Sequence, residues 1–430
     1  RRERMDEREQ KGLMIAATSN IVKRGNETWI VPSQTAKGSK YAVTIAAEGK
    51  ACTCPDFELR QKPCKHIIAV QLVLFRETTT ETKPDGSVVT TTTEAKQVRV
   101  TYGQDWTNYN RSQTLEKELF CGLLHDLCAA VPEPVQVMGR PRIPMSDALF
   151  SACFKVYSTA SSRRFSTDLR EAQTAGYVER PWHFNTVLKV IEDKEITPTL
   201  HKLVAATAAP LKSIESAFAV DSTGFGTQQY YRHVAAKYGR EKFTQDWLKL
   251  HVLVGVKTHT IASCVITDRD GSDSPQFKPL VQDAATIFDM KEITADKAYS
   301  GYDNLELVES IGATPYVPFK VNAVAVARSK RRKPSKTWAR LFHFFQLNRD
   351  EFLAHYHQRS NVESVFSSMK RVFGDTLRSK TIEAQTNELL LKVIAHNIVR
   401  LIHAIFEHGI TVPGLATCTQ SRIDEYKVTA

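Results

Sequence analysis

Short apolar runs alternate with polar turns at the start of the chain, and this pattern predicts a small α+β domain over residues 1–76. Glycine and lysine lie between the apolar runs, where a chain turns most readily at glycine. The predicted elements are a helix over residues 1–20, strands over 28–31 and 41–45, and an apolar helix over 67–75.

A threonine-rich segment follows this domain. Residues 77–98 hold two threonine runs on either side of Lys83-Pro84-Asp85-Gly86. Threonine favours strands and Pro-Asp-Gly favours a turn, so a β-hairpin arm accounts for the composition, and a flexible linker accounts for it as well. We therefore expect a linker or a hairpin arm over residues 77–111.

Helical spacing dominates residues 112–216, where prolines and glycines mark the breaks between helices. We predict an all-helical DNA-binding domain here. One of the breaks contains Gly139-Arg140-Pro141-Arg142, whose two arginines suit the minor groove of DNA. A plain interhelical loop explains the same four residues.

From residue 217 to residue 410 the pattern becomes α/β. An apolar strand over 217–223 is followed by two more apolar runs, 250–257 and 260–267, which a short polar turn joins as an antiparallel pair. The elements that follow are a helix over 277–290, a strand over 292–296, a helix over 303–310, a strand over 315–319, a long helix around residue 363 and a last amphipathic helix over 383–408. Three adjacent strands followed by α-β-α-β-α predict an RNase H-like fold, with a mixed five-stranded sheet and helices. Residues 411–430 are left as a C-terminal tail.

Three acids occupy matching positions in this fold. Asp221 lies on the first strand, Asp296 follows the fourth strand, and Glu363 lies on the long helix. At about 100° per residue, one narrow stripe of that helix holds Tyr356, Arg359, Glu363 and Lys370. The apolar residues on the adjoining face are Val362, Val365, Phe366, Met369, Val372 and Phe373.

These acids suit the cleavage and transfer of phosphodiesters. Such chemistry needs charge neutralised on the attacking and leaving oxygens, which two Mg²⁺ ions about 3.5–4 Å apart provide. Mg²⁺ prefers carboxylate oxygen, and Mn²⁺ accepts the same ligands. We predict that Asp221 bridges the two ions, with Asp296 and Glu363 each holding one. We expect the nearby acids to be solvated; these are Asp268, Asp270, Asp273 and Asp303.

The second candidate site is a cysteine cluster. Cys52 and Cys54 form one tight pair, and Cys64 and His66 form another. Three thiolates and one imidazole make a closed tetrahedral set for a structural Zn²⁺ ion. Free cytosolic thiols near a chance histidine are the alternative. The other cysteines are scattered along the chain.

Composition narrows the class of partner. With 58 lysines and arginines against 47 acids, the net charge of +11 favours a polyanion such as nucleic acid. Eight cysteines in 430 residues do not indicate a disulfide scaffold. We find no run of about 18 apolar residues and no apolar signal-peptide segment at the start. We therefore expect a cytoplasmic protein, associated with the nucleoid of a prokaryote, without a membrane partner.

Together these motifs resemble a known family. Asp221, Asp296 and Glu363, with the Tyr/Arg/Glu/Lys stripe, are similar to the DDE triad of insertion-sequence transposases, over about residues 140–410. The resemblance implies a transposase that binds the ends of its mobile element, cleaves DNA with metal-activated water and joins the 3′-hydroxyl ends to target DNA. The interval between Asp296 and Glu363 is short for this branch, which implies that a β-rich domain inserted there in better-known members is missing. The cysteine region resembles the SWIM zinc finger.

The resemblance also implies roles for basic residues. Tyr356, Arg359 and Lys370 would contact phosphates at the element ends, and a homodimer would assemble on paired ends.

Between the second and third acids, the basic loop 328–340 suits the DNA backbone, with a solvated loop as the alternative. Its candidate DNA-binding residues are Lys330, Arg331, Arg332, Lys333 and Lys336. Trp338 suits either a stacked base or a place in the core.

Two other functions are compatible with the three acids. One is an RNase H-like DNA nuclease without strand transfer, and the other is a transposase-derived DNA-binding regulator. The complete Tyr/Arg/Glu/Lys stripe argues against the first, and the intact triad argues against the second. An assay of strand transfer and of metal-dependent cleavage separates the three functions.

Overall fold

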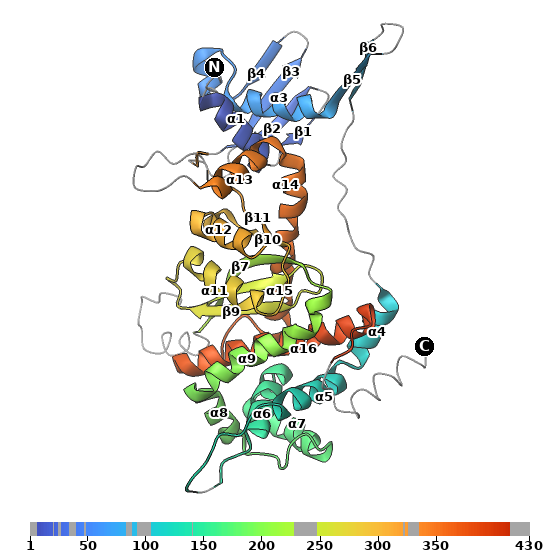
Figure 1. The fold of residues 1–430 in the computed structure, drawn as a ribbon, viewed down its shortest axis with the longest axis vertical. Coiled ribbons are helices and arrows are strands. Elements are labelled where there is room, and N and C mark those ends of the chain that lie inside the picture. The colour runs from blue at the N-terminus through green and yellow to red at the C-terminus, as the bar shows by residue number, and fades with distance from the viewer. Residues whose placement is uncertain are drawn as a thin grey trace, which may run out of the picture. The chain divides into compact units, whose positions relative to one another are not determined.

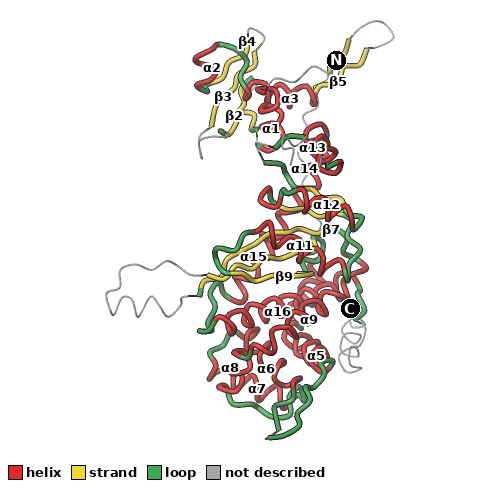
Figure 2. Tube along the Cα trace, turned by 60° about the vertical axis from the view of Figure 1, so that its left-hand side comes forward, coloured by secondary structure: helices red, strands yellow, loops and turns green. Residues whose placement is uncertain are grey.

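A computed structural model describes most of the chain (Figures 1 and 2). The described residues are 7–19, 21–24, 27–33, 40–46, 49–82, 88–92, 105–139, 141–227, 247–320, 323–325 and 335–412. The chain divides into two compact units. The first unit comprises Arg1–Tyr102 and Pro318–Leu353, and the second comprises Gly103–Val317 and Ala354–Ala430.

The first unit contains an antiparallel four-stranded sheet in the order β1-β2-β3-β4. Its strands are β1 Val22–Lys23, β2 Thr28–Pro32, β3 Lys40–Ala46 and β4 Gly49–Cys52, and its helices include α1 Glu7–Thr18, α2 Pro55–Arg60 and α3 Lys65–Glu77. The sequence predicted two of these strands and both long helices. The helices α1 and α3 pack closely at Gly12, because a Cβ atom there would lie 2.7 Å from the Ile68 side chain. Buried core residues include Ile15, Trp29, Val31, Val43, Ile67 and Val70.

The segment 318–353 also belongs to the first unit, although it is far from the N-terminal domain in sequence. It contains α13 Lys336–Leu347 and the start of α14 Arg349–Tyr356. Trp338 is buried and its indole Nε1 donates to the Val324 carbonyl at 2.8 Å, so this side chain is part of the core rather than a free platform for a base. Arg349 donates from Nη2 to the Ser19 carbonyl at 3.1 Å, which ties the segment to the end of α1.

The threonine-rich segment forms a two-stranded antiparallel sheet. Strand β5 Thr78–Thr82 pairs with β6 Val88–Thr92. The register runs from Thr78 opposite Thr92 to Thr82 opposite Val88. Figure 1 labels the two strands. Of the two alternatives that the composition allowed, the backbone adopts the hairpin over these residues.

The second unit is built on a mixed five-stranded sheet in the order β11-β10-β7-β8-β9. The strands are β7 Ala217–Gly226, β8 Trp247–Gly255, β9 Ile261–Thr267, β10 Glu292–Ala295 and β11 Thr314–Tyr316. The strand β8 is antiparallel to β7 and β9, whereas β10 and β11 run parallel to β7. The helices beside the sheet are α11 Asp273–Ala285, α12 Tyr302–Ser310 and α15 Ser360–Phe373. This arrangement is an α/β domain, and its five strands follow the predicted order along the chain.

A helical layer completes the second unit around α16 Ile382–His408. Its other helices are α4 Trp106–Thr114, α5 Glu116–Ala129, α6 Met145–Ser158, α7 Ser162–Thr174, α8 Phe184–Glu192 and α9 Thr197–Ala208. By length and composition α16 is apolar enough to cross a membrane, but 89% of its apolar window is buried inside the protein. We expected it to pack on the sheet or its neighbours; it packs mainly on α9 and α6 (Figure 1).

One asparagine joins α16 to the edge of the sheet. The buried Asn397 amide accepts from Ile261 N–H at 2.8 Å and donates to the Ile261 carbonyl at 2.8 Å. Because β9 is an edge strand, these two backbone groups have no neighbouring strand on that side. The same amide donates to Thr207 on α9 at 3.1 Å. Asn397 therefore continues the strand ladder into the helical layer.

Replacing this amide by an apolar group of similar size tests the link. We expect Asn397→Leu to lower the free energy of unfolding by about 2–4 kcal/mol, because the Ile261 N–H and carbonyl would be buried without partners. Urea denaturation followed by circular dichroism measures the change. Glu383→Gln, at an exposed position on the same helix, is the control and should stay near wild type. A wild-type midpoint for Asn397→Leu would show that the link contributes little.

Candidate active site and metal centre

The three predicted acids lie at neighbouring positions of the second unit. Asp221 lies on β7, and Asp296 directly follows β10. The register pairs Ala295 with Val220, so the two carboxyl-bearing residues are next to each other on parallel strands. Glu363 lies in the first turn of α15, a helix that packs on β7. Strand pairing thus places two of the acids, and helix packing brings the third.

Arg359 connects two of these acids. Its Nη1 lies 2.5 Å from Asp221 Oδ2, and its Nη2 lies 2.7 Å from Glu363 Oε1. The side chains of Arg359 and Asp221 are each 22% exposed, whereas that of Glu363 is 61% exposed. A guanidinium is a planar fork and can hold two carboxylates at once. The arginine therefore holds the helix acid near the strand acid.

The electrostatics of Asp221 reflect this crowding. Burial raises the pKa of its carboxyl group, and the charges of Asp296 and Glu363 act in the same direction. The Ser222 backbone N–H, which donates to Oδ1 at 2.9 Å, and Arg359 oppose the rise. Positive charge stabilises a partly buried carboxylate that has two other carboxylates near it. Carboxylate oxygens are hard ligands and suit a divalent cation such as Mg²⁺.

We expected the polar stripe to lie on one continuous helix, but the structure divides it among three elements. Tyr356 ends α14, Arg359 lies in a 3₁₀ turn over His357–Arg359, and α15 begins at the next residue. The 3₁₀ turn is tighter than an α-helix, and periodicity alone does not detect it. Lys370, near the end of α15, donates to Thr223 Oγ1 at 2.8 Å and lies 5.4 Å from the Phe225 ring.

The apolar face of α15 agrees with the prediction except at one position. Val362, Val365, Phe366, Met369 and Phe373 are buried. Val372 is 47% exposed, so its assignment to the buried face was wrong. Val372 lies in the last turn of the helix, which is capped by Gly374 with φ 82°.

Asp273 is a functional candidate that the sequence reasoning missed, since we expected it to be solvated. It opens α11 and accepts from Ser222 Oγ at 2.8 Å and from Lys249 Nζ at 2.7 Å. The buried His251 places Nδ1 3.4 Å from the same carboxylate oxygen. Burial acts to raise the pKa of Asp273, but the bonds from Lys249 and Ser222 outweigh it and lower the pKa. The signal in the sequence was only a helix start after Ser272.

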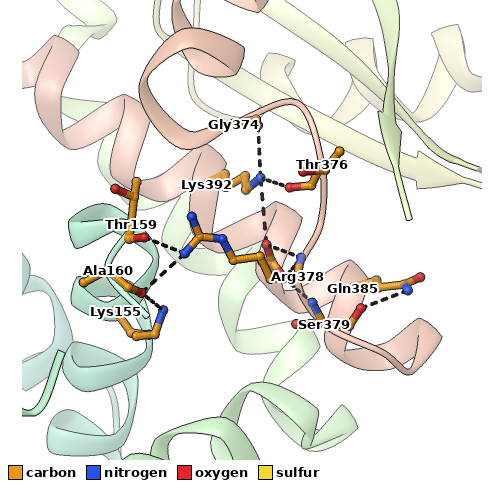
Figure 3. Close-up of polar contacts among 10 residues, drawn as sticks. Lys155, Thr159, Ala160, Gly374, Thr376, Arg378, Ser379, Gln385 and Lys392 are labelled. Carbon is orange, nitrogen blue, oxygen red and sulfur yellow. Dashed lines mark hydrogen bonds and ion pairs between the residues drawn. The ribbon is translucent and has the colours of Figure 1, made fainter. Parts of the chain in front are cut away.

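The connection between α15 and α16 fixes α15 against β7. Gly226 N–H donates to the Asp375 carbonyl at 3.0 Å, and Leu377 N–H donates to the Gly226 carbonyl at 2.8 Å. Buried Lys392 donates to the carbonyls of Gly374 and Thr376 at 3.2 and 2.9 Å (Figure 3). The strand that carries Asp221 and the helix that carries Glu363 are therefore held by one short segment.

Arg378 anchors the same connection to the helical layer. Its guanidinium donates to the carbonyls of Thr159 and Ala160 at the end of α6 (Figure 3). Its backbone N–H donates to Glu388 on α16, whose carboxylate also accepts from Ser379 N–H at 2.8 Å. Arg378 is exposed, whereas Glu388 is buried. A buried carboxylate is stable only when it is hydrogen-bonded, and here backbone N–H groups supply the partners.

The cysteine cluster lies in the first unit. Cys52 ends β4, Cys54 precedes α2, and Cys64 and His66 flank the start of α3. All four residues are buried, and their ligand atoms lie within 4.8 Å of one another. His66 Nδ1 lies 3.8 Å from Cys52 Sγ and 3.9 Å from Cys64 Sγ. These four residues are therefore close enough together to hold one metal ion.

Thiolate chemistry supports metal binding by this cluster. The hydrogen bond between Cys52 and Cys64 lowers the pKa of Cys64 to about 4 and raises the pKa of Cys52. Burial raises the pKa of Cys54. Four buried soft ligands that compete for protons at one point fit a tetrahedral Zn²⁺ ion, which would replace those protons. The residues present therefore fit zinc.

Most of the predicted basic loop lies outside the residues that the structure describes. Lys330, Arg331, Arg332 and Lys333 lie outside the described residues. Lys336 is the first residue of α13, so the loop that we expected over 328–340 ends before that residue. Lys336 belongs to the first unit, whereas the three acids belong to the second.

Comparison with known proteins agrees with both candidate sites. Residues 212–398 match the family model of the transposase DDE domain, which spans the sheet and all three acids. Residues 41–74 match the model of the SWIM zinc finger, which spans the cysteine cluster. The chain therefore carries the DDE domain of transposases, preceded by a SWIM zinc finger, and both resemblances seen in the sequence are confirmed.

Among solved structures, the chain is similar to a piggyBac transposase synaptic complex with hairpin DNA. The identity is 12% and the TM-score 0.37, over 73% of this chain and 80% of that one. No curated protein matches the chain.

Removal of one thiol tests the metal centre. We expect Cys54→Ser to reduce zinc content from about one ion per chain to nearly none, because a closed site requires all four ligands. Mass spectrometry of the purified protein measures the metal. Cys264→Ser, a buried thiol of the second unit, is the control and should keep its zinc. Full zinc in Cys54→Ser would remove this cysteine from the ligand set.

Asp273→Asn tests the network beside Asp221. We expect the rate of DNA cleavage to fall about tenfold to a hundredfold, because a neutral amide holds Lys249 and Ser222 less firmly and lets Asp221 shift. The initial rate of plasmid cleavage measures the change. Asp270→Asn removes a carboxylate that is 82% exposed and should leave the rate unchanged. Equal rates for the two variants would mean that Asp273 does not position the site.

Proposed function

We propose that this protein is a DNA transposase that cleaves DNA at the ends of its mobile element and joins the freed 3′-hydroxyl groups to target DNA. The observation that carries the proposal is the convergence of Asp221, Asp296 and Glu363 inside a matched transposase DDE domain. Two of the acids are adjacent on paired strands, and Arg359 ties the third to Asp221. Few functions other than metal-dependent phosphoryl transfer use such a set of acids.

We propose an RNase H-like fold for the catalytic domain. The sheet supports this proposal through its order, since the three strands that come first in sequence form one half and two parallel strands extend the other. The strands β7 and β10 are neighbours in this order, and α15 packs on β7. In domain terms, we propose a SWIM domain over residues 1–76 and a catalytic domain over 217–410, with the helical domain 112–216 between them.

The three carboxylates would hold two Mg²⁺ ions, with Mn²⁺ as an acceptable substitute. When bound, such ions activate water and neutralise charge on the attacking and leaving oxygens. Asp221, in mid-sheet, faces both other acids and is placed to bridge. Of the two acids that Arg359 contacts, Glu363 is more exposed than Asp221, and it lies on a helix. The Glu363 side chain is therefore free to change its position when DNA enters the site.

Tyr356, Arg359 and Lys370 would contact phosphates near the cleaved bond. Burial raises the pKa of Tyr356, so its hydroxyl stays protonated and can donate to a phosphate oxygen. Arg359 offers a bidentate fork and Lys370 a point charge, and both types bind phosphate. The basic residues 330–333 and Lys336 would add contacts to the DNA backbone.

The remaining assignments follow from this activity. The partner is double-stranded DNA, both the terminal repeats and the target, and the net charge of +11 favours it. We propose a homodimer on paired ends and a cytoplasmic, nucleoid-associated location in a prokaryotic cell. The SWIM zinc finger would take part in recognising the element ends.

A plasmid assay tests the proposed chemistry. We expect a supercoiled plasmid that carries the element's ends to be cut in Mg²⁺ and not in EDTA. Glu363→Gln should abolish cleavage and strand transfer but keep DNA binding, because it removes a metal ligand while preserving shape. Agarose gels report the products, and an electrophoretic shift reports binding.

The matched control for that variant is Glu306→Gln, at an exposed acid on α12. It should cut like wild type. Cleavage without joined products would favour an RNase H-like nuclease. Binding to the ends without cleavage by the wild type would favour a DNA-binding regulator. Loss of both binding and cleavage in Glu363→Gln would mean that Glu363 serves the fold.

A further inference from the structure

The loop between α5 and α6 exposes three large apolar side chains. Val135, Val137 and Met138 are 92%, 87% and 88% exposed. We call residues 131–139 and 141–144 the tip loop. In Figure 1 it projects from the helical layer on the side away from the sheet. Single exposed apolar residues are common, but three within four positions on one projecting loop indicate a binding surface.

Side-chain hydrogen bonds hold the tip loop in shape. Gln136 donates from Nε2 to the Met138 carbonyl at 3.1 Å and accepts from Arg142 N–H at 3.0 Å, so it closes the tip. Glu133 accepts from Met145 N–H at 2.7 Å and 2.8 Å, which fixes the base of the loop to the start of α6. The apolar side chains are therefore presented by a preorganised loop, which lowers the entropy cost of binding.

Two exposed arginines belong to the tip loop and to its base. Arg142 is exposed on the returning arm of the tip loop. At its base, Ile143 and Trp182 line the same small cavity, and the guanidinium of exposed Arg180 lies 3.9 Å from the centre of the Trp182 ring. The one acid of the tip loop, Glu133, is engaged by backbone N–H groups. An apolar tip with flanking arginines complements a groove between two phosphate backbones.

We propose that the tip loop is a minor-groove wedge that inserts Val137 and Met138 against base steps of duplex DNA, with Arg142 and Arg180 on the flanking phosphates. This proposal rests on the proposed function, which supplies DNA as the partner. Proteins that bend DNA insert apolar side chains such as methionine between base steps from the minor groove, and they place arginine beside them. A second copy of the chain fits less well, because stable protein interfaces bury about 800 Å² per partner and three side chains on a narrow loop supply much less.

The test uses the full-length protein and fluorescent duplexes of about 30 bp, with A·T-rich or G·C-rich centres and 2-aminopurine at the central step. For wild type we expect 2-aminopurine emission to rise on binding, and netropsin, which occupies the minor groove, to compete. Val137→Ala/Met138→Ala should bind about tenfold more weakly and lose the rise in emission, since the wedge is gone. Arg142→Gln should reduce the slope of log affinity against log salt by about one.

The control is Ile382→Ala, which removes apolar surface at a position that is 54% exposed elsewhere in the second unit. It should match wild type, and all variants should keep the wild-type melting temperature because their side chains are exposed. Equal affinity and equal emission for wild type and the double variant would overturn the proposal. Loss of self-association in the double variant, with unchanged DNA binding, would also overturn it and favour a protein partner.

Failure of this proposal is distinguishable from failure of the proposed function. If wild type and the double variant cut the plasmid and bind duplexes alike, the tip loop has no wedge role and the transposase assignment stands. If wild type binds none of the duplexes and cuts no plasmid, the transposase assignment itself fails.

Discussion

Mutual repulsion among three carboxylates is the constraint on which the rest of the second unit depends. Asp221 and Asp296 are adjacent because β7 and β10 pair in parallel, and Glu363 approaches from a separate helix. Burial raises the pKa of Asp221, and the charges of Asp296 and Glu363 add to the rise, so without positive charge this group of acids favours protonation or separation. The guanidinium of Arg359 supplies that charge through two ion pairs. The site can thus be assembled before any metal ion arrives.

An ion pair between a helix and a strand positions the acids only if both elements are held in place. The connection after α15 holds them, because its backbone pairs with Gly226 on the strand that carries Asp221. Lys392 and Glu388 are almost fully buried on α16 and bind backbone groups of the connection. Burying them costs desolvation energy, which their hydrogen bonds offset. The polar interior of the helical layer therefore serves the geometry of the acids.

Sequence alone predicted the parts that depend on local pattern. Apolar runs predicted the five strands. Asp221 and Asp296 became candidates because of their positions on or directly after two of these strands. Contacts between distant residues were not predictable. Asp273 meets Lys249 and Ser222 only after the chain has folded, and nothing local distinguishes it from the solvated Asp270. The 3₁₀ turn over His357–Arg359 was missed because helical periodicity continues across it.

The interval between Asp296 and Glu363 shows how a short insertion can still be structured. Helices α13 and α14 have 12 and 8 residues, and helices of this length are marginal in water without a packing partner. Their partner is the N-terminal domain, with which 318–353 forms one compact unit. That domain has a small core, and the three cysteines of the cluster are part of it. We therefore expect the stability of the domain to depend on the cysteine cluster. The segment that joins the second acid to the third is consequently linked, through packing, to the zinc finger.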